Sequence, residues 1–126
     1  MLNGVKNEVL CVRGNCEAEV DQMVLEFPVL AEYAVLMYRS HIIYASHGHI
    51  TNPHNVPPLK AGDILLNGHT HVPACEKTGD ILYMNPGSLS IPKEHSCHSY
   101  MLWEDDTFQW KNVETGEVYH EYVYEE

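Results

Sequence analysis

The stretch DILLNGHTH, residues 63–71, joins a short apolar run to a polar ending. The run Asp63–Asn67 predicts a buried β-strand, because a continuous apolar segment of about four to eight residues is typical of a strand covered on both faces. Gly68 then lets the backbone turn tightly, and His69 and His71 follow the turn. The chain thus presents two imidazole groups directly after a buried strand.

Two other predicted strands also run into polar clusters. The strand His41–Ala45 leads into S-H-G-H at residues 46–49, and the strand Glu8–Val12 leads into G-N-C at residues 14–16. Ligands bind to open α/β sheets at the carboxyl ends of strands, where loops converge. Neutral imidazole is a good ligand for zinc, manganese or iron, and an amide oxygen suits harder cations. One histidine at a strand end is more often a structural residue, but two H-x-H pairs together with G-N indicate a shared metal site.

The rest of the chain predicts a single strand-rich α/β domain over residues 1–126. A helical spacing of apolar residues predicts a helix at Glu17–Phe27, which Pro28 ends. Residues 39–40 are a candidate tight turn, and the proline-rich segment Asn52–Lys60 is a predicted loop. Five further strands are predicted at Tyr33–Tyr38, Ile81–Asn85, Ser99–Trp103, Phe108–Val113 and Val118–Tyr124.

The charge balance argues against one class of partner. The chain contains 18 acidic and 7 basic residues, which give a net charge of −11. A surface that binds nucleic acid through its phosphates needs clustered lysine and arginine, so no such partner is expected. We also expect no signal peptide and no membrane span, since no apolar run approaches the ~20 residues that cross a bilayer. The four cysteines form no C-x-x-C pair, so we expect free thiols and a cytoplasmic location.

Four short motifs together resemble a known family. G-N-C-E at residues 14–17, S-H-G-H at 46–49, G-H-T-H at 68–71 and N-P-G-S at 85–88 are similar to the last motifs of the calcineurin-like metallophosphoesterases, in particular the small bacterial phosphodiesterases. The resemblance implies an α/β (α+β) fold, an αββα sandwich that holds two divalent ions between its sheets. The motifs D-x-H and G-D, which come first in that family, do not precede residue 14. We therefore expect a domain that is incomplete at its N-terminus.

The resemblance also assigns metal ligands. It implies that Asn15, His47 and His69 ligate one ion and that His71 ligates the other. The expected metal is manganese (Mn2+), with zinc (Zn2+), nickel (Ni2+) or iron (Fe2+) as alternatives. One ion rather than two is expected here, because the absent motifs would supply most ligands of the second.

Two residues are candidates for catalysis. Cys16 occupies the place where many family members carry a histidine that stabilises or protonates the leaving group, and a small packing residue is the alternative interpretation. A thiol with a pKa near ~8.5 can donate a proton, although it is a different acid from imidazole. His49 is expected to contact the substrate or to hold the ligands in place. Ser88 lacks the G-x-S-x-G context of a serine hydrolase, so that chemistry is not expected.

These features predict metal-dependent hydrolysis of a small phosphodiester, or of a phosphomonoester, by a metal-activated hydroxide. The alternatives are a non-catalytic metal-binding remnant, one half of a split enzyme that needs a partner segment, and a reading frame that starts at an internal methionine. Because the strand Glu8–Val12 would have an uncovered edge, we also expect a homo-oligomer or another association through that edge.

Overall fold

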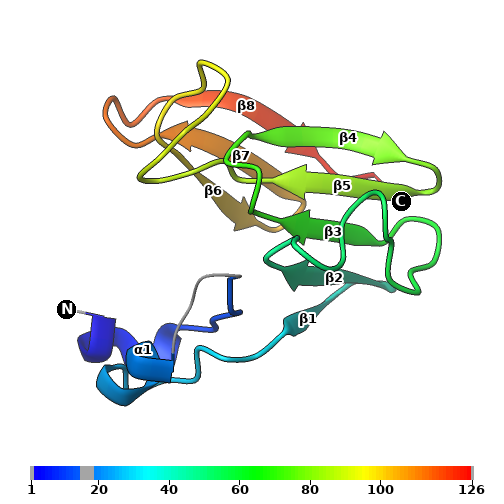
Figure 1. Cartoon of the computed structure of the whole chain (residues 1–126). Helices are drawn as coiled ribbons and strands as arrows, with labels where there is room; N and C mark the ends of the chain where they lie inside the picture. The colour runs from blue at the N-terminus through cyan, green and yellow to red at the C-terminus, as the bar shows by residue number, and fades with distance from the viewer. Residues whose placement is uncertain (1, 15–18, 126) are drawn as a thin grey trace.

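The computed structural model describes residues 2–14 and 19–125 (Figure 1). Among these residues no helix is long and apolar enough to cross a membrane. The described elements are a 3₁₀ helix η1 (Leu2–Glu8), an α-helix α1 (Glu19–Val24) and the strands β1 (Tyr33–Tyr38), β2 (His41–Ser46), β3 (Ile64–Asn67), β4 (Ala74–Thr78), β5 (Ile81–Asn85), β6 (Ser99–Glu104), β7 (Thr107–Asn112) and β8 (Val118–Val123).

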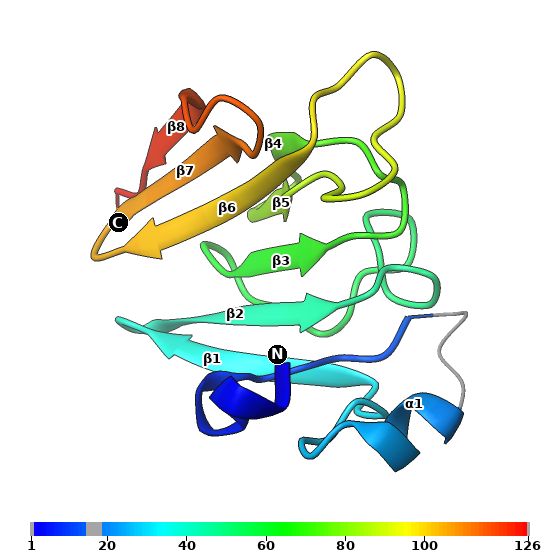
Figure 2. The same cartoon turned by 90° about the vertical axis from the view of Figure 1, so that its left-hand side faces the viewer.

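The strands form two sheets. Sheet 1 has the order β1-β2-β3-β5-β4, in which β2, β3 and β5 run parallel to one another and the edge strands β1 and β4 are antiparallel to their neighbours. Sheet 2 is the antiparallel meander β6-β7-β8. Figure 1 and Figure 2 show sheet 2 packed over one face of sheet 1, with α1 and the N-terminus on the β1 side. Two sheets with few helices confirm the expected strand-rich α/β (α+β) class.

One apolar core lies between the sheets. Ile43, Ile64 and Met84 of sheet 1 pack with Phe108 and Trp110 of sheet 2, and all five side chains are buried. They share one face of their strands, as the two-residue period of β-structure requires. Burial of a side chain of this kind stabilises a fold by about 1.5–3 kcal/mol. This core is therefore the main link between the sheets.

The sheets are also bonded to each other at the β1–β2 and β6–β7 turns, a region that we call the tied end. The Tyr38 ring contacts the Tyr124 ring edge to face, with centroids 5.1 Å apart. The Tyr38 hydroxyl donates to the Asp106 carboxylate, which also accepts a hydrogen bond from Arg39 Nε at 2.9 Å. These donors, Arg39 above all, hold the pKa of Asp106 below its usual value. The Tyr124 hydroxyl donates to the Gly62 carbonyl at 2.8 Å, so the tied end is cross-linked by rings and hydrogen bonds.

The predicted strand Glu8–Val12 is wrong. η1 extends to Glu8, and residues 9–14 join neither sheet. The Arg13 amide donates to the Ala31 carbonyl at 2.8 Å, but no strand pairs with this segment along its length. A short apolar run adopts strand structure only where a neighbouring strand supplies the ladder and the packing. The exposed edge that was expected at Glu8–Val12 is therefore not present.

The predicted helix Glu17–Phe27 is longer than the observed one. α1 ends at Val24, and residues 17–18 lie outside the described part of the chain. Gln22 explains the early end, because its side chain donates to the Phe27 carbonyl at 3.0 Å and accepts from the Val29 amide at 2.8 Å. A side chain that bonds the backbone in this way replaces a further helical turn.

The remaining predicted strands are present, with ends that differ by one residue or less from the prediction, and residues 39–40 form the expected turn. β4 was not predicted, because ACEKT at residues 74–78 carries two charged residues and lacks an apolar run. It is an edge strand that pairs only with β5, so its polar side chains can face solvent. Cys11, Cys75 and Cys97 are free thiols, as expected, and Cys16 lies outside the described residues.

Candidate metal site

Because β2, β3 and β5 run parallel, the three loops that follow them lie at the same end of sheet 1, beside the carboxyl ends of these strands. β2 and β3 pair from Ile43↔Ile64 to Ser46↔Asn67, and β3 pairs in the same sense with β5. Residues 46–49, 68–71 and 85–88 therefore leave the sheet at the same edge. We call these three segments the histidine end. It lies at the carboxyl ends of β2 and β3, whereas the tied end lies at their amino ends.

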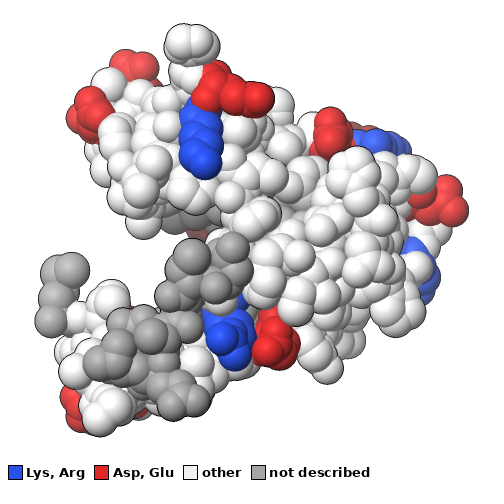
Figure 3. Space-filling model, viewed as in Figure 1, with Lys and Arg blue, Asp and Glu red and all other residues white. Residues whose placement is uncertain are grey.

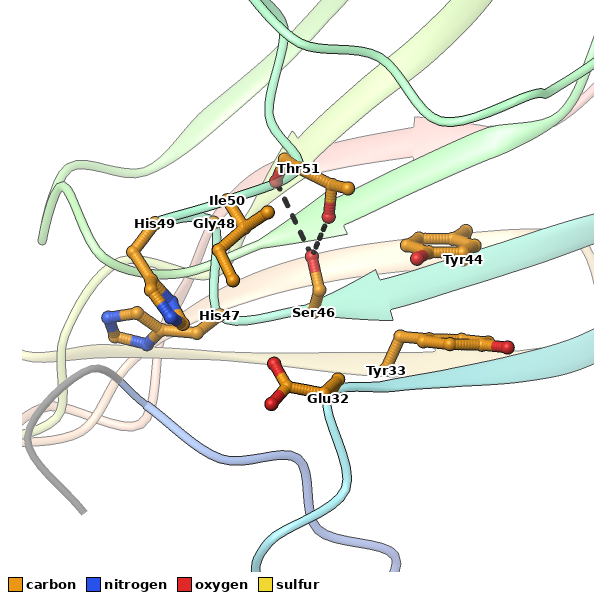
Figure 4. A pocket seen from close by; sticks show the side chains of 9 residues that line it. All are labelled: Glu32, Tyr33, Tyr44, Ser46, His47, Gly48, His49, Ile50 and Thr51. Atoms are coloured by element: carbon orange, nitrogen blue, oxygen red, sulfur yellow. Dashed lines mark hydrogen bonds between the residues drawn. The ribbon is translucent and has the colours of Figure 1, made fainter.

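Three imidazole rings meet at the histidine end. His47 Nε2 lies 3.0 Å from His69 Nδ1, and the two ring centroids are 4.9 Å apart. The His49 ring lies beside both, with its centroid 5.3 Å from that of His47 and 6.4 Å from that of His69. Figure 4 shows the His47 and His49 side chains next to each other at one side of a cavity. The structure thus gathers three predicted site residues into one group, which we call the imidazole cluster.

The imidazole cluster fits part of a metal site. Two nitrogens that each ligate one ion at ~2.1 Å lie about 3 Å apart when they subtend a right angle at the ion. His47 Nε2 and His69 Nδ1 are hydrogen-bonded to each other at 3.0 Å, a distance close to that separation. Within residues 2–14 and 19–125, no group of three or more His, Cys, Asp or Glu is placed to hold an ion. The described residues therefore supply a partial ligand set.

His49 Nδ1 in the imidazole cluster and Asn67 Oδ1 at the end of β3 are buried and have no hydrogen-bond partner among the described residues. Asn67 is 2% exposed, and its amide nitrogen donates to Ser46 Oγ at 3.0 Å, so the side chain is held in place. An unpaired buried polar atom costs on the order of 1–3 kcal/mol. Such atoms call for an explanation, and contact with a bound ion, water or substrate is the usual one.

The backbone of the histidine end is strained. His69 and His71 both have φ = 63°, in the left-handed region that costs an L-residue roughly 1–3 kcal/mol. Gly48 has φ = 109°, and a Cβ atom there would lie 3.1 Å from the Asn67 Cβ. A glycine at this position therefore allows the loop after β2 to approach the end of β3.

Asn85 anchors the loop that carries His69. This side chain is fully buried, and its amide nitrogen donates to the Gly68 carbonyl at 2.9 Å. Its side-chain oxygen accepts a hydrogen bond from the Gly87 amide at 2.9 Å, and its backbone carbonyl accepts from Trp110 Nε1 at 2.8 Å. No role was expected for Asn85 from the sequence. The available signal was an amide at the end of an apolar strand, where burial obliges it to find partners.

His71 is held separately from the imidazole cluster. Its Nδ1 lies 2.7 Å from the Ile91 carbonyl oxygen, and because a carbonyl only accepts, Nδ1 carries the proton and Nε2 keeps the lone pair. The Ile91 amide in turn donates to the Ser88 hydroxyl at 2.9 Å. In the part of the chain that is described, His71 makes no ring contact with the other three histidines of the two H-x-H motifs. Ser88 therefore supports the loop that orients His71.

Asn15 and Cys16 lie outside the described residues, so their predicted roles stay predictions. The chain just before them approaches the histidine end, because Arg13 Nη1 lies 3.7 Å from Glu32 Oε1. Glu32 lines the same cavity as His47 and His49. Figure 4 shows the Glu32 carboxylate on the side of that cavity nearest to His47.

Two cavities adjoin the imidazole cluster. The one in Figure 4 has a volume of about 80 Å³, enough for a few water molecules at about 30 Å³ each. A groove of about 610 Å³ lies next to it, lined by His69, Asn67 and His54 among others. Small-molecule sites have volumes of about 300–1,000 Å³, so the groove can hold a small ester.

The surface around the site is not a basic one. In the view of Figure 3, lysine and arginine side chains are scattered and do not gather in one patch. With a net charge of −11, the chain would repel an anionic substrate. A bound divalent ion reverses the local sign of charge, which a phosphate needs for binding.

Residues 1–107 match the calcineurin-like phosphoesterase superfamily domain. The chain belongs to this superfamily. It is 44% identical over 105 residues to phosphodiesterase YfcE of Escherichia coli K12, an alignment that covers 83% of this chain and 57% of YfcE. The solved structure of E. coli YfcE, a phosphoesterase, superimposes with a TM-score of 0.93 at 37% identity and covers 98% of this chain and 68% of that chain.

A more distant relative covers a similar share of both proteins. The probable metallophosphoesterase YsnB of Bacillus subtilis is 25% identical in an alignment that covers 79% of this chain and 78% of YsnB. Against YfcE, by contrast, this chain spans little more than half of the relative's length.

Proposed function

We propose that this chain binds a divalent metal ion at the imidazole cluster and takes part in the hydrolysis of phosphodiesters. The observation that carries the proposal is the 3.0 Å approach of His47 Nε2 to His69 Nδ1 at the carboxyl edge of a parallel sheet. Asn15 is the proposed third ligand, and His71 is proposed for a second ion. The likeness to YfcE supports the substrate class. Manganese is the proposed metal, with zinc, nickel and iron as alternatives, and the cytoplasm is the proposed location.

The residues of the site would have separate roles in the reaction. A bound ion would supply a hydroxide near neutral pH by lowering the pKa of water, and would offset the charge of the phosphate. His47 and His69 would hold that ion. Cys16 is proposed to donate the proton that the leaving oxygen takes up.

A second candidate is a metal-binding half of a split enzyme or a remnant without catalysis. The observation that favours it is the incomplete ligand set in the described residues. Both candidates share the same metal at the same histidines. They differ in whether turnover occurs, and in what has to be added for turnover.

An activity assay separates the candidates. Hydrolysis of bis(4-nitrophenyl) phosphate with Mn2+ is measured for the chain alone and for the chain mixed with the part of E. coli YfcE outside the aligned region. We expect the chain alone to be barely above background and the mixture to be faster by several orders of magnitude. The His69→Ala variant should abolish this gain, and the His95→Ala variant, in an exposed loop, should not.

Metal retention without turnover in the mixture would favour the remnant over the split enzyme. Full activity of the chain alone would contradict the proposed ligand set, because other groups would then have to complete the site. Absence of any bound metal in the unmodified chain would contradict both candidates.

A further inference from the structure

One carboxylate lies beside the imidazole cluster. Tyr33 at the start of β1 pairs with Ser46 at the end of β2. Because these strands are antiparallel, the next step of the same register places Glu32 opposite His47, and residues opposite each other have Cα atoms about 4.5–5.5 Å apart. Glu32, His47 and His49 line the same cavity, and Figure 4 shows the Glu32 carboxylate on its side nearest to His47. An acidic side chain therefore accompanies two of the histidines.

The Glu32 side chain is not fixed by burial. It is 56% exposed, and its Oε1 lies 3.7 Å from Nη1 of Arg13, a side chain that is itself 35% exposed. An exposed ion pair of this kind contributes little to stability. A divalent ion carries twice the charge of Arg13 and binds a carboxylate oxygen at about 2.0–2.2 Å, so it attracts the carboxylate more strongly.

A carboxylate also completes the chemistry that two imidazole groups begin. Two histidines and one glutamate are the protein ligands of some catalytic zinc sites, in which water takes the open position. Carboxylate oxygen suits manganese better than it suits soft ions. Among the residues that the structure describes, no group of three or more His, Cys, Asp or Glu already surrounds an ion position. A third ligand from these residues therefore has to move to the ion.

We propose that Glu32 is a carboxylate ligand of the ion that His47 and His69 bind, and that it leaves Arg13 for this ion when metal is present. The inference rests on the proposed metal binding and adds to it a residue outside the four sequence motifs. Metal binding would then connect the start of β1 to the ends of β2 and β3. An anionic oxygen ligand at this place would also favour manganese among the proposed metals.

Metal affinity tests the proposal without an assay of turnover. Titration calorimetry with Mn2+ is carried out on the metal-free chain and on variants. Glu32→Gln keeps the size of the side chain and removes the anionic ligand, so it should weaken Mn2+ binding at least tenfold. Glu26→Gln is the matched control, because Glu26 is 55% exposed and pairs with one cation, Lys6, at 3.3 Å. This control should leave the affinity within about twofold of that of the unmodified chain.

The competing partner gives a second control. Arg13→Gln removes the cation that Glu32 would leave and keeps the carboxylate, so it should not weaken Mn2+ binding. Glu32 and Arg13 are both on the surface, so these substitutions should leave the fold intact, and thermal melts without metal check this.

Salt distinguishes a ligand from a charge that is merely close. The Debye length falls to about 3 Å at 1 M salt, so the effect of a carboxylate that does not contact the ion is largely screened. The difference in affinity between Glu32→Gln and the unmodified chain should persist in 1 M NaCl. With Co2+ in place of Mn2+, loss of a ligand should also change the visible absorption spectrum of the bound ion.

The outcomes separate this proposal from the proposed function. Equal Mn2+ affinity of Glu32→Gln and the unmodified chain would overturn the role of Glu32 and leave His47 and His69 as ligands. A difference that disappears in 1 M NaCl would overturn it as well, because Glu32 would then act only as a nearby charge. Absence of bound metal in the unmodified chain would contradict the proposed function and this inference together.

Discussion

The two ends of sheet 1 are built in opposite ways. At the tied end, the ring of Tyr38 and the hydrogen bonds of Asp106 and Tyr124 join the two sheets. At the histidine end, His49 Nδ1 and the adjacent Asn67 Oδ1 are buried without partners among the described residues, and His69 and His71 have φ = 63°. The contacts at the tied end stabilise the fold, whereas the unpaired polar atoms and the positive φ angles at the histidine end destabilise it.

Positive φ occurs at both ends, but with a different meaning. At the tied end it is found at Arg39 (55°) and Asp105 (53°), in two-residue turns between paired strands. Positive φ is ordinary in turns of that length. His69 and His71 follow a parallel strand and connect no hairpin, so their conformation is not explained by turn geometry. Strain that persists outside ordinary turns is typical of binding sites.

The largest effect on stability is expected at the tied end. Tyr38→Ala removes a buried ring that contacts the Trp103 and Tyr124 rings, and should lower the free energy of unfolding by about 3–5 kcal/mol. Tyr33→Ala, on the same strand but 54% exposed, should lower the free energy of unfolding by about 1 kcal/mol, because the stacking on Tyr44 is lost. Chemical denaturation of both variants measures the difference. Equal losses would mean that Tyr38 does not organise the tied end.

The next effect concerns metal affinity at the histidine end. His47→Ala removes a proposed ligand, and should weaken Mn2+ binding by more than the about 10–100-fold that loss of an outer partner costs. Its melting temperature without metal should stay close to that of the unmodified chain, because His47 is only half-buried. Titration calorimetry with His95→Ala as the matched control checks this. Equal affinity in the two variants would place the metal elsewhere.

Asp63 predicts a dependence of stability on pH. Burial of its carboxyl group opposes ionisation, but hydrogen bonds from Lys60 and Ile42 outweigh burial and hold its pKa below the ordinary 3.8. A lowered pKa contributes stability that is present above pH 3.8 and is lost as the pH falls through the folded-state pKa. Asp63→Asn should therefore lower the free energy of unfolding by on the order of 1–3 kcal/mol at pH 7. The difference in unfolding free energy between the variant and the unmodified chain should disappear in acid. A difference that stays constant down to pH 2 would contradict the assignment.

The smallest expected effect is an increase in stability. His69→Gly should raise the free energy of unfolding of the metal-free chain by about 0.5–1 kcal/mol, because glycine adopts the left-handed region without strain. The same variant should lose metal binding. His47→Ala, at a residue without positive φ, should show no such gain. A loss of stability in His69→Gly would show that the imidazole contact outweighs the backbone strain.

The sequence predicted the sheets better than it predicted the chain leading into them. Strands bounded by turn residues, such as His41–Ala45, were found because local patterns and burial agree there. Residues 8–12 were misassigned because the apolar pattern of a strand does not reveal whether a neighbour exists to pair with it. β4 was missed for the converse reason, since pairing with β5 imposes strand structure on a polar segment.

The sequence predicted which histidines lie together, and it did not predict the residues that support them. His47 and His69 could be placed together because parallel strands end at one edge of a sheet. The supporting roles of Asn67 and Asn85 could not be derived, because they depend on which carbonyl and amide groups reach each amide side chain in three dimensions. The positive φ of His69 could not be predicted either, because a histidine in a sequence is a weak signal for that conformation.

The central claim is that the imidazole cluster at the histidine end binds the metal, and Mn2+ titration followed by NMR of the histidine rings tests it most directly. Paramagnetic Mn2+ broadens the signals of nearby rings, and single variants assign the signals. The account predicts that substoichiometric Mn2+ broadens the ring signals of His47, His69 and His49 first, while those of His95 and His120 stay sharp. Broadening that begins at His95 or His120, or that affects all rings equally, would contradict it.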